Sequence, residues 1–117
     1  MNVFEEIKSI LAEILDVEVN EVTPESYLIR ELGAESIDLM ELAAALNQRF
    51  RIEVNEEDVF LRELRNNLAD AEAAKGTDRF PFLTARRREE IVSELDGGPV
   101  LKVKDVVSYV TWQLERA

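Results

Sequence analysis

Ser36 is the side chain in this sequence best placed to take part in chemistry. It lies in the run Leu32–Leu42, where an acidic loop gives way to apolar residues at helical spacing. Serine is a preferred residue at helix N-termini, so its hydroxyl is expected at the positive end of a helix dipole. Gly33 permits a close backbone approach just upstream. The simplest interpretation of Ser36 is a helix cap with no further role.

The residue types that are missing limit the chemistry this chain can perform. Its 117 residues include no cysteine and no histidine. Disulfides, a thiolate nucleophile and the commonest general base and metal ligand are therefore excluded. The spacing Asp16-x-Glu18-x-Asn20 imitates the start of a calcium loop, but Glu21 stands where that loop requires a glycine. We predict no metal site.

The helix that follows Ser36 has two apolar faces. Apolar residues recur at three- and four-residue spacing and predict a helix over 36–50. The face expected to be buried comprises Leu39, Leu42, Ala43, Leu46 and Phe50. Ile37, Met40 and Ala44 lie on a different face, between the acids Asp38 and Glu41. This strip is either a second packed side in a helical bundle or a docking surface for a basic partner.

An amphipathic helix and a long loop precede Ser36. The pattern predicts a helix over residues 2–15, with Asn2 as its cap. Residues 16–35 are expected to form a long ordered loop that Leu28 and Leu32 hold against the core. Connections of this length are uncommon unless they are functional.

Helical segments are also predicted for the second half of the chain. Asn55 is expected to cap a short third helix, and the helical period continues to about Lys75. Thr84 is expected to cap a further helix, and a last helix spans 101–115 despite its valine content. Ile91, Val92 and Leu95 are expected on one side of the helix after Thr84.

The net charge of -11 is distributed unevenly. Residues 1–60 carry 15 acidic and four basic side chains, whereas residues 61–117 carry ten of each. Such a field repels nucleic-acid phosphates and anionic lipids and favours basic protein surfaces. The arginines at 86–88 are therefore expected to pair with Glu89, Glu90 or the acidic first half and not to bind nucleic acid.

No apolar run approaches the roughly 20 residues that span a bilayer, and the N-terminus lacks the basic region of a signal peptide. We expect a cytoplasmic protein with no membrane insertion.

The run around Ser36 resembles the phosphopantetheine attachment signature of acyl carrier proteins, in which a serine in a Gly-x-Asp-Ser-Leu context begins the second helix. The residues that match this signature are Gly33, Ser36, Asp38, Glu41 and Leu42. Glu35 replaces the usual Asp, and Ile37 replaces the usual Leu. The last helix is similar to the family's Val-x-Asp-x-Val-x-Tyr run, which is matched by Val103, Asp105, Val107 and Tyr109. The related peptidyl carrier proteins usually have a His before the serine and are less acidic.

The resemblance implies an all-α fold. This fold is a four-helix acyl-carrier-like bundle with about two additional helical segments between the third and last helices. The chain, residues 1–117, would then be a single acyl-carrier-like domain with an insertion at about 65–100. The insertion would enlarge the helical core or cover a cleft for an acyl chain.

The resemblance also implies a carrier and not an enzyme. A phosphopantetheinyl transferase would attach a 4'-phosphopantetheine arm from coenzyme A to Ser36, where a helix N-terminus tolerates the phosphate. The thiol of the arm would carry acyl groups as thioesters for fatty acid, lipid or polyketide-type biosynthesis. The protein would be a monomer.

The partners implied are this transferase and acyl-transferring and acyl-modifying enzymes with basic docking surfaces. The expected docking residues are Glu35, Ile37, Asp38, Met40 and Glu41. The residues expected to line the acyl-chain cleft are Leu42, Leu46, Val59 and Leu61.

Two other classes of function stay open at this point. One is an acidic helical adaptor that binds a basic protein partner, with Ser36 only a helix cap. The other is a small enzyme built on acid pairs such as Asp38 with Glu41, which is disfavoured without histidine, cysteine or a metal site. Covalent modification of Ser36 distinguishes a carrier from both.

Overall fold

The computed structural model describes residues 2–54, 82–94 and 100–116. Within these ranges the secondary structure is helical, and an isolated antiparallel bridge joins Tyr27 to Lys102. The predicted all-α bundle is therefore confirmed. The third helix and the helical segment predicted to reach Lys75 lie outside the described residues, as do Val59 and Leu61.

The first helix, α1 (Val3–Leu15), forms as its amphipathic pattern predicts. Asn2 caps it, since its side-chain Oδ1 accepts the backbone N–H of Glu5 at 3.1 Å. Its inward face buries Ile7 and Leu11 against α2 (Ser36–Phe50) and α6 (Val103–Arg116).

The segment between α1 and α2 is an ordered loop with a single 3₁₀ turn, η1 (Val19–Glu21). Leu28 is buried and Leu32 packs against the core, as predicted. Backbone bonds join this loop to the start of α6: Leu28 donates to the carbonyl of Leu101, and Val103 donates to that of Ser26, both at 3.0 Å. The loop that leads to Ser36 is therefore fixed to the last helix.

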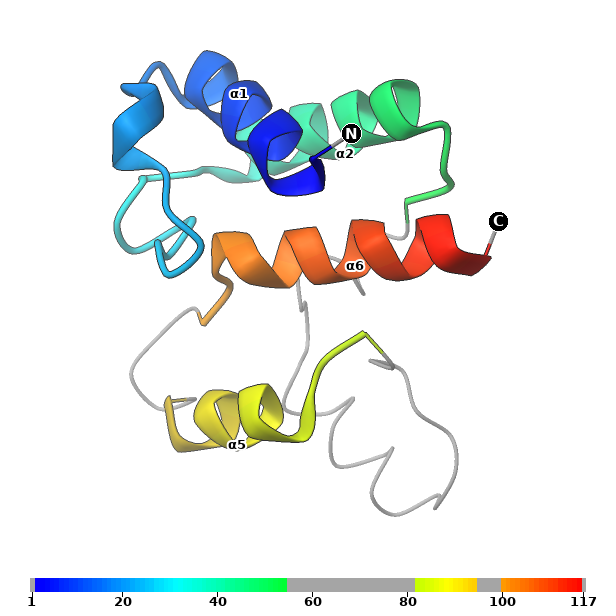
Figure 1. Cartoon of the computed structure of the whole chain (residues 1–117). Coiled ribbons are helices and arrows are strands. Elements are labelled where there is room, and N and C mark those ends of the chain that lie inside the picture. The colour runs from blue at the N-terminus through cyan, green and yellow to red at the C-terminus, as the bar shows by residue number, and fades with distance from the viewer. Residues whose placement is uncertain (1, 55–81, 95–99, 117) are drawn as a thin grey trace.

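Helix α6 occupies the middle of the molecule, with α1 and α2 on one side and α5 (Ala85–Glu94) on the other (Figure 1). Its Val103, Val106 and Val110 are fully buried at three- and four-residue spacing. Tertiary packing of this face outweighs the preference of valine for strands.

Helix α5 begins after Thr84, as predicted, because the Thr84 hydroxyl accepts the backbone N–H of Arg87 at 3.1 Å. Ile91 is buried but Val92 is exposed, so the two do not share a side of the helix as expected, and Leu95 lies outside the described residues. Successive helical residues lie about 100° apart, and on α5 this rotation turns Val92 away from the core that Ile91 enters.

One hydrophobic core runs through the described residues and includes Phe82, Leu83 and Ile91 beside α6. The Phe82 ring meets Tyr109 edge-on, with centroids 5.1 Å apart and planes at 88°. In the ranges described, no helix has the length and apolar character needed to cross a bilayer.

Candidate functional site

Ser36 is the first residue of α2 and its side chain is exposed. The residue before it, Glu35, is the N-cap, with an extended backbone whose carbonyl accepts the N–H of Leu39 at 3.0 Å. The expectation that Ser36 itself caps the helix is therefore wrong by one residue.

Asp38 completes the cap of α2 in a capping box with Glu35. Its Oδ2 accepts the backbone N–H of Glu35 at 2.9 Å, and its negative charge lies in the first turn of α2. Both effects favour the helix start. The hydroxyl of Ser36 is consequently not needed to hold the helix end and is available for another role.

The backbone just before Ser36 has a defined conformation at Gly33 and Ala34. Gly33 has a φ of 73°, in the left-handed region that glycine occupies at little cost. The next residue, Ala34, is buried and donates its N–H to the carbonyl of Leu28 at 3.0 Å. This bond closes the loop and sets where α2 begins.

The predicted docking strip is on the outside of α2. Ile37 and Met40 expose 62% and 58% of their surface, although both are large and apolar. Glu35 and Glu41 are exposed beside them, and Asp38 is half-buried. The structure therefore brings an apolar strip and carboxylates together immediately after Ser36, on a side of the helix that the described core does not cover.

Leu42 and Leu46 are on the opposite side of the same helix, with 1% and 0% of their surface exposed. Both belong to the hydrophobic core. An acyl chain that entered between α2 and its neighbours would therefore replace core contacts, and would gain the same apolar surroundings that these leucines have.

A second polar cluster joins α5 to the start of α6, and the sequence pattern did not reveal it. Nε and one Nη of Arg87 donate to the two carboxylate oxygens of Asp105, each at 2.7 Å, and that Nη also donates to the carbonyl of Val100 at 2.8 Å. Arg87 is 5% exposed and Asp105 is 1% exposed. Burial opposes the charge on the guanidinium, but the hydrogen bonds and charge of Asp105 outweigh it and raise the pKa of Arg87.

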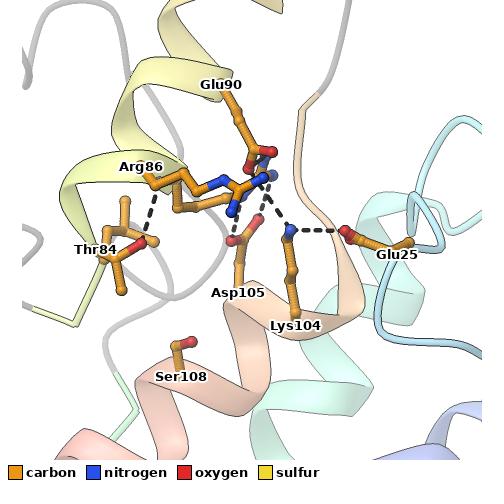
Figure 2. A pocket seen from close by; sticks show the side chains of 9 residues that line it. Glu25, Thr84, Arg86, Glu90, Lys104, Asp105 and Ser108 are labelled. Carbon is orange, nitrogen blue, oxygen red and sulfur yellow. Dashed lines mark hydrogen bonds and ion pairs between the residues drawn. The ribbon is translucent and has the colours of Figure 1, made fainter.

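Lys104 extends this cluster to the loop before Ser36. Its Nζ lies 2.7 Å from Glu25 and 3.6 Å from Glu90, so it joins the loop to α5 (Figure 2). The hydrogen bond from Lys104, opposed by partial burial, lowers the pKa of Glu25. A pocket of about 430 Å³ lies among these side chains and also touches Ser108 of α6 (Figure 2).

The pairing expected for the three arginines is partly confirmed. One Nη of Arg87 lies 3.7 Å from Glu90, as predicted, but its principal partner is Asp105. Asp105 is 18 residues further along the chain, and only the fold shows that the two meet.

The other end of α5 reaches the loop through Tyr27. The Tyr27 hydroxyl donates to Glu94 at 2.6 Å. This bond, together with burial, raises the pKa of Tyr27. The same bond lowers the pKa of Glu94, against the opposing effect of burial.

The family described as "Phosphopantetheine attachment site" matches residues 5–69, a range that includes Ser36 and all of α2. An acyl carrier protein of Helicobacter hepaticus is 40% identical over 76 residues, which are 64% of this chain and 100% of that protein. An acyl carrier protein of Helicobacter pylori is 44% identical over 57 residues, which are 49% of this chain and 73% of that protein.

Proposed function

This chain belongs to the acyl carrier protein family, and from that premise we propose that Ser36 is the residue that bears its 4'-phosphopantetheine arm. As a member it is an acyl carrier with a covalently attached 4'-phosphopantetheine group. The observation that carries the assignment to Ser36 is an exposed hydroxyl at the first position of α2, next to a helix end that Glu35 and Asp38 already cap.

The residues around Ser36 fit a phosphodiester. The N–H groups of Ser36 and Ile37 precede the first intrahelical bond and point out of the helix end, where the positive pole of the dipole favours an anion. The nearby carboxylates of Glu35 and Asp38 would repel a phosphate. The Asp38 carboxylate, however, is directed toward the backbone of residue 35, because it accepts the N–H of Glu35. The phosphate can therefore lie on the solvent side of the helix end.

In the attachment step, Oγ of Ser36 attacks the phosphorus on the pantetheine side of the coenzyme A pyrophosphate. One P–O bond forms to Oγ, the pyrophosphate P–O bond breaks, and the adenosine phosphate half leaves. The partner transferase takes the serine proton, since this chain has no histidine or cysteine to act as base. When bound, the arm supplies a thiol that holds acyl groups as thioesters.

The apolar strip with its acids is proposed as the surface that the transferase and the acyl-handling enzymes recognise. Exposed Ile37 and Met40 offer apolar contact, while Glu35, Asp38 and Glu41 attract basic surfaces. Electrostatic attraction speeds encounter without the tight burial that would slow release, which suits a carrier that visits several enzymes.

The acyl chain is proposed to enter the apolar space that Leu42 and Leu46 line on the inner side of α2. Acylation should then shift the methyl signals of these two leucines in NMR spectra. The methyl signals of Val92, which is exposed on α5, are the internal control and should stay unchanged. Unchanged Leu42 and Leu46 signals would contradict this part of the proposal.

The test of the attachment site is an intact-mass measurement after incubation with coenzyme A and a broad-specificity phosphopantetheinyl transferase. The parent should gain one phosphopantetheine unit, and Ser36→Ala should gain none. Ser9→Ala, which removes another exposed helical hydroxyl, is the matched control and should be modified like the parent. Modification of Ser36→Ala would show that the arm is attached elsewhere.

The docking strip is tested with the same reaction at varied carrier concentration. Met40→Glu should raise the KM of the transferase for the carrier, because it places a charge within the apolar contact. Val92→Glu makes the same change at another exposed apolar residue and should leave KM unchanged. Equal KM values for the two variants would show that the strip is not part of the docking surface.

A further inference from the structure

Helix α5 carries one row of polar residues that faces the rest of the protein. Arg87, Glu90 and Glu94 are three and four positions apart and therefore share a side of the helix. Arg87 and Glu90 contact the first turn of α6, at Asp105 and Lys104. Glu94 reaches further, to Tyr27 in the loop before Ser36. The helix is thus fixed to α6 at one end and to this loop at the other.

The contact between Glu94 and Tyr27 is specific. The Tyr27 hydroxyl donates to Oε1 at 2.6 Å, and the second carboxylate oxygen of Glu94 is buried without a hydrogen-bond partner in the described part of the chain. Cations flank the ring of Tyr27, with Arg30 and Lys102 at 4.7 and 4.9 Å from its centroid. The side chain of Tyr27 is therefore held from several directions in one position.

The backbone of Tyr27 organises the loop that ends at Ser36. Its carbonyl accepts the N–H groups of Glu31 and Leu32 at 3.0 and 3.1 Å, and its own N–H donates to the Glu31 carboxylate at 3.0 Å. The next carbonyl, that of Leu28, accepts the N–H of Ala34 at 3.0 Å. The residues that hold the start of α2 are thus bonded to Tyr27 and its neighbour.

We propose that Tyr27 and Glu94 are positioning residues, through which α5 holds the 27–34 loop in the conformation that presents Ser36 to a phosphopantetheinyl transferase. The inference rests on the proposed role of Ser36. It assigns a function to α5, a helix that has no part in the docking strip on α2. Neither side chain touches the reacting atoms.

The kinetic consequence is an effect on KM. Without the bond, the loop samples more conformations, and the transferase binds only the productive one. The apparent affinity of the transferase for the carrier therefore falls in proportion to the population of that conformation. A hydrogen bond to a charged group can account for about a tenfold change in an equilibrium constant. We therefore expect KM for the carrier to rise by up to about tenfold, with kcat little changed.

The experiment compares Tyr27→Phe and Glu94→Ala with the parent in the attachment reaction, at a temperature at which circular dichroism shows each variant to be folded. Both should raise KM, and the double variant should raise it no further, because either single change already removes the same bond. Glu94→Gln keeps an acceptor oxygen for the Tyr27 hydroxyl, so its KM should be close to that of the parent. Glu89→Ala deletes a carboxylate from an exposed position of α5 and should behave as the parent.

Amide NMR signals of the loop provide a readout that general destabilisation would not move. The signals of Glu31, Leu32, Ala34 and Ser36 should shift in Tyr27→Phe and Glu94→Ala, and should stay at parent positions in Glu89→Ala. Parent values of KM together with unshifted loop signals would overturn the inference while the role of Ser36 stands. Failure of the parent to be modified at Ser36 would instead overturn the proposed function.

Discussion

Removal of the Arg87 guanidinium is expected to destabilise the fold strongly. Arg87→Met keeps an aliphatic chain of similar length but deletes both bonds to Asp105 and the bond to the carbonyl of Val100. The carboxylate of Asp105, 1% exposed, is then left buried without its cation. Breaking one side of a buried ion pair costs about 3–5 kcal/mol. Since small domains are stable by only about 5–15 kcal/mol, this is a large share of the total.

The assay is equilibrium unfolding in urea, followed by circular dichroism. Arg86→Met makes the same chemical change at the preceding, exposed arginine and should alter the free energy of unfolding by less than about 0.5 kcal/mol. The double variant Arg87→Met with Asp105→Asn should be more stable than Arg87→Met alone, because no charge is then stranded while the amide can still accept the N–H of Lys102. Equal stability of Arg87→Met and Arg86→Met would refute the stabilising role assigned to the buried pair.

Three further predictions follow from the site. Ser36→Ala should lose arm attachment yet change the free energy of unfolding by less than about 0.5 kcal/mol, because Glu35 and not Ser36 is the cap; a loss near 2 kcal/mol in urea unfolding would contradict this. Asp38→Ala removes the bond to the Glu35 N–H and a favourable charge, and should cost about 1 kcal/mol in the same assay, whereas no cost would show that another group caps α2. The lowered pKa of Glu94 contributes stability above its ordinary value of 4.5 that is lost as pH falls through the lower folded-state pKa. Urea unfolding should therefore show a smaller loss of stability between about pH 6 and about pH 3 in Tyr27→Phe than in the parent. Equal losses would exclude the Tyr27 bond as the cause.

Much of the fold could be predicted from local pattern. The helices α1 and α2 follow from apolar spacing, and the buried residues of α2 are those expected, because helical periodicity and burial are two consequences of the same geometry. The bounds predicted for α2, residues 36–50, are those of the structure, but its cap was assigned one residue too late, to Ser36 in place of Glu35. Serine is a far commoner cap than glutamate, so the pattern favoured Ser36, whereas the structure shows Glu35 at the cap position, paired with Asp38 in a capping box.

The part of the site that depends on long-range contact could not be predicted. Arg87 and Asp105 are 18 residues apart, and Tyr27 and Glu94 are 67 apart. In sequence each is an ordinary charged or polar residue, and many pairings would have been equally reasonable. Folding places one row of α5 against α6 and the loop, and this selects the partners.

The central claim, that Ser36 bears the arm, is tested most directly by fragmentation mass spectrometry. The parent protein would be modified with coenzyme A and a transferase and then digested, and the peptide that contains the run Leu32–Leu42 would be sequenced. The account predicts that the added phosphopantetheine, and the loss of it on fragmentation, map to Ser36 alone. A modified peptide that lacks Ser36, or an unmodified protein after reaction with several transferases, would contradict it.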